Sequence, residues 1–523
     1  MFPSRIYECD SVIYATRAIH ADISEAVDAA HLGFDLIEYG TARMGRRLSP
    51  PASPICILAY VSVAAGLSGI LVFWYLLRRL GASTATGVLL SGSLMFSYTY
   101  WHYSLQAESH ILAGLLIMLL ALQVHRLLGR PTLGNALATS LLLALATLIH
   151  QTSALLLPAI LAGVMMASGS RTSKYKVLLA LIISPVILIG VPTLFVGILV
   201  ARGSSAGDLH PWLASSQLRH WGHWRAMSLP SAAVGLARSF AGSHYLLGFD
   251  QFRRFALRLF PSSSLQDELR VAGLVPAQIR LALVPVQTVL MVFFGWAGLG
   301  ALRRLRSASV MGNPYTGFLV AWVLTLTVFV IWWAPERSEF WIVILIPGML
   351  LLGIPGLSRP VSGIRLPAAG ILVAALFAVN FLGSIYPQSA RVAERETCVA
   401  VGIDAVVETG DIVLSDCGFS GRASRYVPSF QKVNLLAPGG RAEAGGGLEH
   451  MIPCAMCAVD SLLTIAARDR RTVYIIMTPL SEEPEPGRLY AGILNEVQER
   501  FVMSGIIPVR APVELRRIES RKP

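Results

Sequence analysis

Ten separate apolar runs, most of them long enough to cross a lipid bilayer, constrain the fold of this chain more than any other feature. They lie at roughly 53–77, 85–103, 108–126, 134–150, 152–168, 177–200, 279–302, 315–334, 338–356 and 364–385. Of the 523 residues, 54% are hydrophobic and only 14% are charged, and the mean hydropathy is +0.60. The sequence therefore predicts a mainly α-helical, polytopic membrane protein with about ten spans.

Basic residues mark one side of this membrane protein. Lysine and arginine outnumber aspartate and glutamate by 43 to 31, and they cluster at alternate connections between the apolar runs. These connections contain Arg78, Arg79, Arg126, Arg130, Arg171, Lys174, Lys176, Arg303, Arg304, Arg306, Arg359 and Arg365. By the positive-inside rule they are cytoplasmic, so the basic excess indicates topology in an inner or plasma membrane rather than nucleic-acid binding.

The same rule divides the chain into three parts. Residues 1–52 are predicted to form an outer loop of amphipathic helices, because apolar residues recur at three- and four-residue spacing between Val12 and Ala30. Residues 53–386 form the membrane domain, with a long outer loop at 201–278. Since the first loop is polar and lies outside, we expect a further membrane helix upstream that ends near Glu8.

The polar C-terminal part, residues 387–523, is predicted to be a small extracytoplasmic α/β domain. Helical patterns near Arg391 to Glu408, Met451 to Ala467 and Leu489 to Met503 alternate with apolar strands at Asp411 to Ser415 and Thr472 to Met477. Such alternation favours a parallel sheet.

The first loop holds the densest run of acids and histidines, from Glu8 to Tyr39. A solvated helix face accounts for most of its acids, including Asp35. Asp10 and His31 are the candidates for chemistry in this segment.

The other outer connections carry a second group of candidates. Glu108 begins an apolar run, where a carboxylate is costly unless it is paired or caps the helix. His150 lies at the tip of a tight hairpin. Arg337 offers a planar, permanently charged group suited to phosphate, and an ion pair with a neighbouring glutamate such as Glu339 is the alternative interpretation.

Taken in order, these segments resemble the GT-C superfamily of membrane glycosyltransferases, which includes the protein O-mannosyltransferases and many uncharacterised bacterial relatives. The resemblance covers about residues 8–386. It rests on Asp10-Ser11, His31-Leu32-Gly33-Phe34, Tyr103-Ser104-Leu105-Gln106-Ala107-Glu108, Leu148-Ile149-His150-Gln151 and the segment Pro335 to Trp341.

The resemblance implies transfer of a sugar from a polyprenyl-phosphate donor to an acceptor lipid, glycan or protein on the outer face. By position, Asp10 matches the catalytic base of the class. The familiar pattern has adjacent Asp and Glu, whereas here Cys9 separates Glu8 from Asp10, so Glu8 and Glu108 remain alternative bases.

Four further residues are predicted to bind substrate, namely His31, His150, Arg337 and Glu339. No cofactor is expected. His220 and His223 could share a divalent metal, but the sequence shows no third ligand beside them.

Two other classes of function fit the sequence. A lipid or polysaccharide transporter would have a similar helix count, and Pro185, Pro192 and Pro347 interrupt apolar runs. A transporter should also carry mid-membrane charges or paired repeats, whereas the ionisable residues here lie at the outer ends of the runs. A non-catalytic GT-C-like scaffold is the third hypothesis.

Overall fold

The computed structural model describes two compact units, one helical and one α/β. The described residues are 31–48, 54–168, 170–203, 224, 228–259, 266–306, 312–389, 411–415, 431–434, 459, 462–464, 466–468, 472–476, 484–503 and 515–520. Asp10, His220 and His223 lie outside them.

The helical unit contains six helical segments that are long and apolar enough to cross a membrane. They lie in α4 (Pro54–Arg79), α7 (Ser109–Gly129), α10 (Arg171–Gly203), α16 (Ala277–Leu305), α18 (Pro314–Trp333) and the continuous segment made of α21 (Leu366–Asn380), η5 (Phe381–Ile385) and α22 (Tyr386–Gln388). Each of them coincides with one of the predicted runs.

The other four predicted runs are helical but shorter. They are α5 (Thr84–Met95), α8 (Leu133–Ile149), η1 (Gln151–Leu156) continued by α9 (Leu157–Met166), and η4 (Ser338–Trp341) continued by α19 (Ile342–Gly353). The run predicted at 85–103 is divided, because α5 stops and α6 (Tyr98–Ser104) begins after a break at Phe96 and Ser97. The apolar run at 85–103 therefore forms two helices rather than one.

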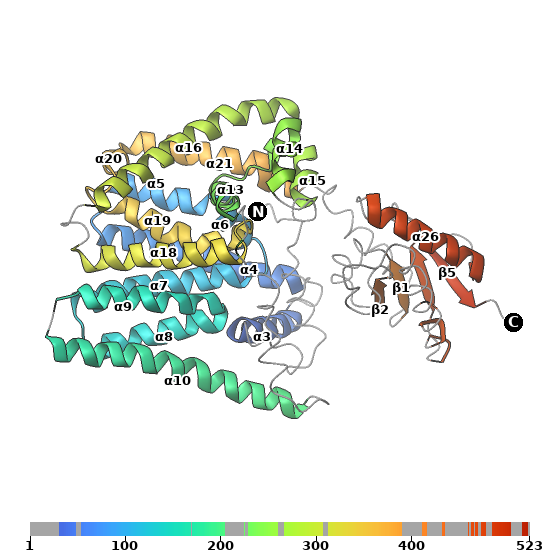
Figure 1. Cartoon of the computed structure of the whole chain (residues 1–523), viewed down its shortest axis with the longest axis horizontal. Coiled ribbons are helices and arrows are strands. Elements are labelled where there is room, and N and C mark those ends of the chain that lie inside the picture. Colours follow the sequence, from blue (N-terminus) through green and yellow to red (C-terminus); the bar gives the residue numbers. More distant parts are fainter. Residues whose placement is uncertain are drawn as a thin grey trace. The chain divides into compact units, whose positions relative to one another are not determined.

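The two ends of the helical unit differ. Figure 1 shows α3 (Leu32–Leu48), α6 and α13 (Ser228–Phe240) at one end, here called the polar end, and α20 (Arg359–Ser362) at the opposite end. Helices α14 (Asp250–Leu259) and α15 (Gln266–Leu274) also lie at the polar end, and η2 (His244–Gly248) packs against both of them.

Helix α3 corrects one expectation of the sequence. Its acids were predicted to form a solvated face, but Asp35 and Glu38 are buried, whereas Leu36 and Ile37 are 39% and 40% exposed. The carboxyl groups lie on the side of α3 that packs against α4 and α8. Amphipathicity alone locates the two faces of a helix and leaves open which of them is covered.

The α/β unit contains a mixed sheet rather than a purely parallel one. Its strands are β1 (Ile412–Ser415), β2 (Gln431–Asn434), β3 (Val473–Ile476), β4 (Phe501–Met503) and β5 (Leu515–Ser520), in the order β2-β1-β3-β5-β4. The strands β2, β1 and β3 are parallel, as predicted, while β5 runs antiparallel to both β3 and β4. Helix α26 (Pro484–Arg500) ends before Phe501, because residues 501–503 pair with β5.

Candidate active site

Helix α3 begins on top of the end of α8. A Cβ atom at Gly33 would lie 3.1 Å from the carbonyl carbon and oxygen of Leu148, so this glycine lets the two backbones approach closely. The Nδ1 atom of His31 is 3.4 Å from the carbonyl oxygen of Ile149. The first turn of α3 is thereby held against the hairpin tip that carries His150.

Three histidine rings meet at this place. The ring centroid of His150 lies 4.9 Å from that of His31 and 4.4 Å from that of His110. The Nδ1 atom of His150 is 2.7 Å from Oγ1 of Thr152. Burial, and then the nearby His110 and His31, lower the pKa of His150 well below its ordinary value, so its ring is neutral at neutral pH.

Carboxyl groups complete what we call the histidine–carboxylate cluster: His31, Asp35, Glu38, Glu108, His110 and His150. Glu38 is 3% exposed, and its Oε1 atom is buried without a hydrogen-bond partner. Burial, followed by the charges of Asp35 and Glu108, raises the pKa of Glu38 well above its ordinary value. Glu38 therefore tends to hold a proton beside two other carboxyl groups.

Glu108 occupies the N-cap position of α7, but its side chain makes no capping hydrogen bond. Capping was the competing interpretation of this residue, and the structure does not support it. The carboxyl group is 2% exposed and acts electrostatically on Glu38 instead. It also lies at the N-terminus of α7, which is the positive end of the helix dipole.

A line of contacts leads from the cluster to Arg337. The ring of Tyr103 lies 6.0 Å from that of His110, and its hydroxyl donates to Oε2 of Glu339 at 2.9 Å. The other oxygen of Glu339 accepts from Arg337 at 3.1 Å. The ion pair foreseen as an alternative is thus present, and the guanidinium remains 40% exposed and so accessible to a ligand.

Beside α13 the polar end is hollowed by a cavity of about 340 Å³. Its walls are largely apolar and come from Ala233, Val234, Ala237, Arg238, Ser243, His244, Leu246, Leu247, Phe252, Phe255, Ala256, Glu268, Gln287 and Met291. Arg238 and Glu268 form an ion pair across it. Because Arg238 and Glu268 carry opposite charges, the cavity walls carry little net charge.

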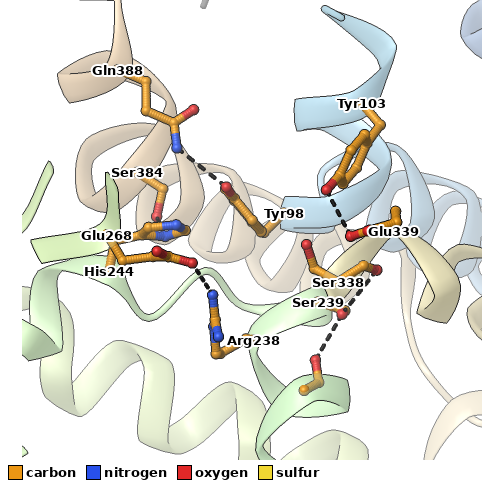
Figure 2. A network of polar contacts seen from close by, with 11 residues as sticks. Tyr98, Tyr103, Arg238, Ser239, His244, Glu268, Ser338, Glu339, Ser384 and Gln388 are labelled. Atoms are coloured by element: carbon orange, nitrogen blue, oxygen red, sulfur yellow. Dashed lines mark hydrogen bonds and ion pairs between the residues drawn. The ribbon is translucent and has the colours of Figure 1, made fainter. Parts of the chain in front are cut away.

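Figure 2 shows the polar side chains behind this cavity. His244 lies with Nδ1 2.8 Å from Oγ of Ser384, and its ring centroid is 4.5 Å from that of Tyr98. Gln388 donates to the Tyr98 hydroxyl at 3.2 Å and accepts from Nδ1 of His102 at 2.9 Å. Burial, and then Arg238 and His102, lower the pKa of His244 well below its ordinary value, so this wall is neutral as well.

Comparisons with known proteins bear on the fold. No protein-family model matches the sequence. No curated protein matches it either. The structure resembles the crystal structure of ArnT from Cupriavidus metallidurans bound to undecaprenyl phosphate, with a TM-score of 0.58 and 11% identity, over 98% of this chain and 94% of that one.

The apo form of ArnT gives a TM-score of 0.55 at 13% identity, over 98% of this chain and 94% of that one. ArnT is a GT-C glycosyltransferase. The chain has the GT-C fold.

A further GT-C glycosyltransferase, the oligosaccharyltransferase of Archaeoglobus fulgidus, has a TM-score of 0.49 and 13% identity, over 89% of this chain and 62% of that one. The two ArnT structures, whose sequences are only 11% and 13% identical to this one, confirm the sequence-based expectation of a GT-C fold.

Within this GT-C fold, the structure brings five of the six predicted site residues to the polar end. His31 and His150 are in ring contact, Glu339 and Arg337 form an ion pair, and Glu108 lies in the histidine–carboxylate cluster. Asp10, the predicted base, lies outside the described residues, and its role stays a prediction.

Sequence reasoning missed four members of the site. Asp35 was assigned to a solvated face, Tyr103 was named only as part of a resemblance motif, and Glu38 and His110 were not selected. The signal for His110 is its position in the first turn of α7, at the same end of that helix as Glu108. Nothing local distinguishes Glu38 from a surface acid.

In the part of the chain that the structure describes, no group of three or more His, Cys, Asp or Glu side chains could hold a metal ion. The expectation that no cofactor is needed stays a prediction. The chemistry available to this GT-C fold from the described residues is proton transfer by carboxyl groups and binding of an anion by Arg337.

Proposed function

We propose that this protein is a membrane glycosyltransferase that moves a sugar from a polyprenyl-phosphate-linked donor to an acceptor on the outer face of the membrane. The observation that carries the proposal is the buried histidine–carboxylate cluster, linked through Tyr103 and Glu339 to a partly exposed arginine, at one end of a GT-C fold. ArnT, which has the same fold, binds undecaprenyl phosphate.

Sidedness supports an outer site. The connections at the end opposite to the histidine–carboxylate cluster carry clusters of arginine and lysine, including Arg78 and Arg126. By the positive-inside rule that end faces the cytoplasm, so the polar end faces outward. On this topology the α/β unit is also extracytoplasmic, since it follows a span that ends at the polar end.

The chemistry needs a base and a cation. A sugar attached to a phosphate is already activated, so the acceptor hydroxyl must lose a proton while the leaving phosphate is stabilised. Asp10 is the proposed base, with Glu108 as the alternative carboxylate inside the cluster. Arg337 is the proposed phosphate ligand, because a guanidinium binds two phosphate oxygens at once.

The cavity beside α13 suits the lipid part of such a donor. Its apolar walls would cover isoprenoid units, and Arg238 lies at its polar side. No aspartate or glutamate lies inside any of the six candidate spans, so a charged mid-membrane pathway of the transporter type has no support there.

The test is transfer of radiolabelled sugar from a panel of polyprenyl-phosphate sugars in membranes that contain the protein. Wild type should transfer from at least one donor, and Asp10→Asn should abolish it. Asp250→Asn is the matched control, because Asp250 is exposed on α14 at the same end. Transfer unchanged in Asp10→Asn moves the base to Glu108 or Glu8, and no transfer from any donor rejects the proposal.

A further inference from the structure

Helix α13 makes contacts on two of its sides. Ala233, Val234, Ala237 and Arg238 line the cavity. Gly235 and Ser239, one turn apart on another side of the helix, contact the segment Pro335–Trp341, which carries Arg337 and Glu339. The same short helix therefore touches the cavity and the segment that holds the proposed phosphate ligand.

The contact at Gly235 leaves no room for a side chain. A Cβ atom there would overlap with the carbonyl oxygen of Pro335 and lie 2.8 Å from Nε1 of Trp341. That Nε1 atom donates to the same Pro335 oxygen at 3.1 Å. Because the obstacle is a hydrogen-bonded backbone group rather than the end of a flexible side chain, any larger residue must displace the segment.

A second contact fixes the middle of the segment. The Ser239 hydroxyl is 2.7 Å from the carbonyl oxygen of Gly235 and 3.3 Å from that of Ser338. Thr99 of α6 donates to the same Ser338 oxygen at 2.8 Å. Figure 2 shows Ser239 beside Ser338, with Glu339 and Tyr103 next to them.

The position of Ser338 in the chain determines which side chains the contact with α13 can affect. Its two neighbours are Arg337 and Glu339, which form the ion pair described above. Glu339 in turn accepts from Tyr103, whose ring adjoins His110 of the histidine–carboxylate cluster. A shift of α13 therefore moves the guanidinium and the carboxylate together.

We propose that α13 positions Arg337 and Glu339 against the head of a ligand whose apolar part fills the cavity, with Gly235 and Ser239 as positioning residues. The proposal rests on the proposed function, which supplies a lipid-linked donor as that ligand. Filling the cavity presses on Ala237 and Arg238, and the close contact at Gly235 passes the displacement to Pro335 and Ser338.

The test uses hydrogen exchange in the full chain, reconstituted in lipid nanodiscs, with undecaprenyl phosphate as the probe. Native mass spectrometry measures whether the lipid binds, and exchange is followed in peptides that cover 335–341. In wild type the lipid should bind and slow exchange in this segment, with no change in the connection around Gly81 at the opposite end.

The Gly235→Ala variant should bind the lipid but lose the exchange response, and its sugar transfer should fall by about tenfold to a hundredfold, as expected for groups displaced by about 1 Å. Gly273→Ala is the matched control, since that α15 glycine has no atom within 4 Å of the added carbon. If Gly235→Ala fails to fold, Ser239→Ala removes only the hydroxyl and should weaken the same response.

Each outcome separates this inference from the proposed function. Lipid binding and transfer in wild type without slower exchange at 335–341 overturn the coupling and leave the transferase standing. A normal response in both Gly235→Ala and Ser239→Ala overturns it as well. A wild-type protein that binds no polyprenyl phosphate refutes both proposals together.

Discussion

Two regions at the polar end contrast with each other. The histidine–carboxylate cluster beneath α3 combines three carboxyl groups and three imidazoles, and every one of the carboxyl groups is buried. The cavity beside α13 is lined mainly by alanine, leucine and phenylalanine, with a single ion pair between Arg238 and Glu268. The cluster contains groups that can exchange protons, whereas the cavity has room for a ligand.

The difference shows how one end of a helical unit can serve two physical tasks. Carboxyl groups in a buried cluster are tolerated only if protons, histidines or a ligand compensate their charge. A cavity costs contacts with neighbouring atoms until something apolar fills it. The protonation state of its side chains should therefore determine how the cluster behaves, and the shape of its walls should determine what the cavity binds.

The sharpest test of this contrast is Glu108→Gln. The substitution keeps the shape of the side chain and removes the charge, so donor binding should persist while transfer falls by about a hundredfold or more if Glu108 serves as a base. Steady-state kinetics with varied donor should show a lower kcat and an unchanged KM. A variant that retains wild-type kcat would remove Glu108 from the chemistry.

The cavity can be tested by filling it. Ala237→Trp places an indole in the cavity, so the donor KM should rise by about tenfold, equivalent to about 1.4 kcal/mol. The neighbouring Leu236→Trp is the control, because Leu236 is 39% exposed. Equal effects of the two variants would show that the cavity does not hold the donor.

The smallest expected effect concerns Glu38. Its pKa is raised in the folded protein, so the unfolded state ionises first as the pH rises, and wild type loses stability relative to a variant that stays neutral. Glu38→Gln should therefore unfold a few degrees higher than wild type at about pH 8, and the difference should vanish below about pH 4.

Thermal unfolding followed by circular dichroism checks this prediction. The Glu496→Gln variant provides a control at a partly exposed glutamate of α26, which pairs with Arg500 on the helix surface. A Glu38→Gln variant that is less stable than wild type at about pH 8 would mean that Glu38 is ionised and paired in the fold.

The helices of the membrane domain could be predicted from the sequence because apolar character is a local property. All ten predicted runs are helical, but the run at 85–103 is divided at Phe96 and Ser97, where Asn380 of a distant helix donates to the carbonyl oxygen of Phe96. The α/β unit shows the same limit. The strands β1 and β3 were predicted from their apolar residues, whereas β2, β4 and β5 were missed because β4 has only three residues and β2 and β5 contain charged side chains.

The candidate site was predictable only in part. Glu108, His150 and Arg337 could be selected because each lies where an apolar run begins or ends, and such ends of successive spans meet at one side. Asp35 and Glu38 could not be selected, since the burial of one face of α3 depends on its packing against α4 and α8.

By itself the sequence determined the spans, because hydrophobicity acts without knowledge of neighbouring segments. Their direction across the membrane is a prediction from the distribution of arginine. Only the tertiary structure decided which of the polar groups touch. The contacts of His31 with His150, Tyr103 with Glu339, and Gly235 with Pro335 each join residues about a hundred or more positions apart, so no local pattern encodes them.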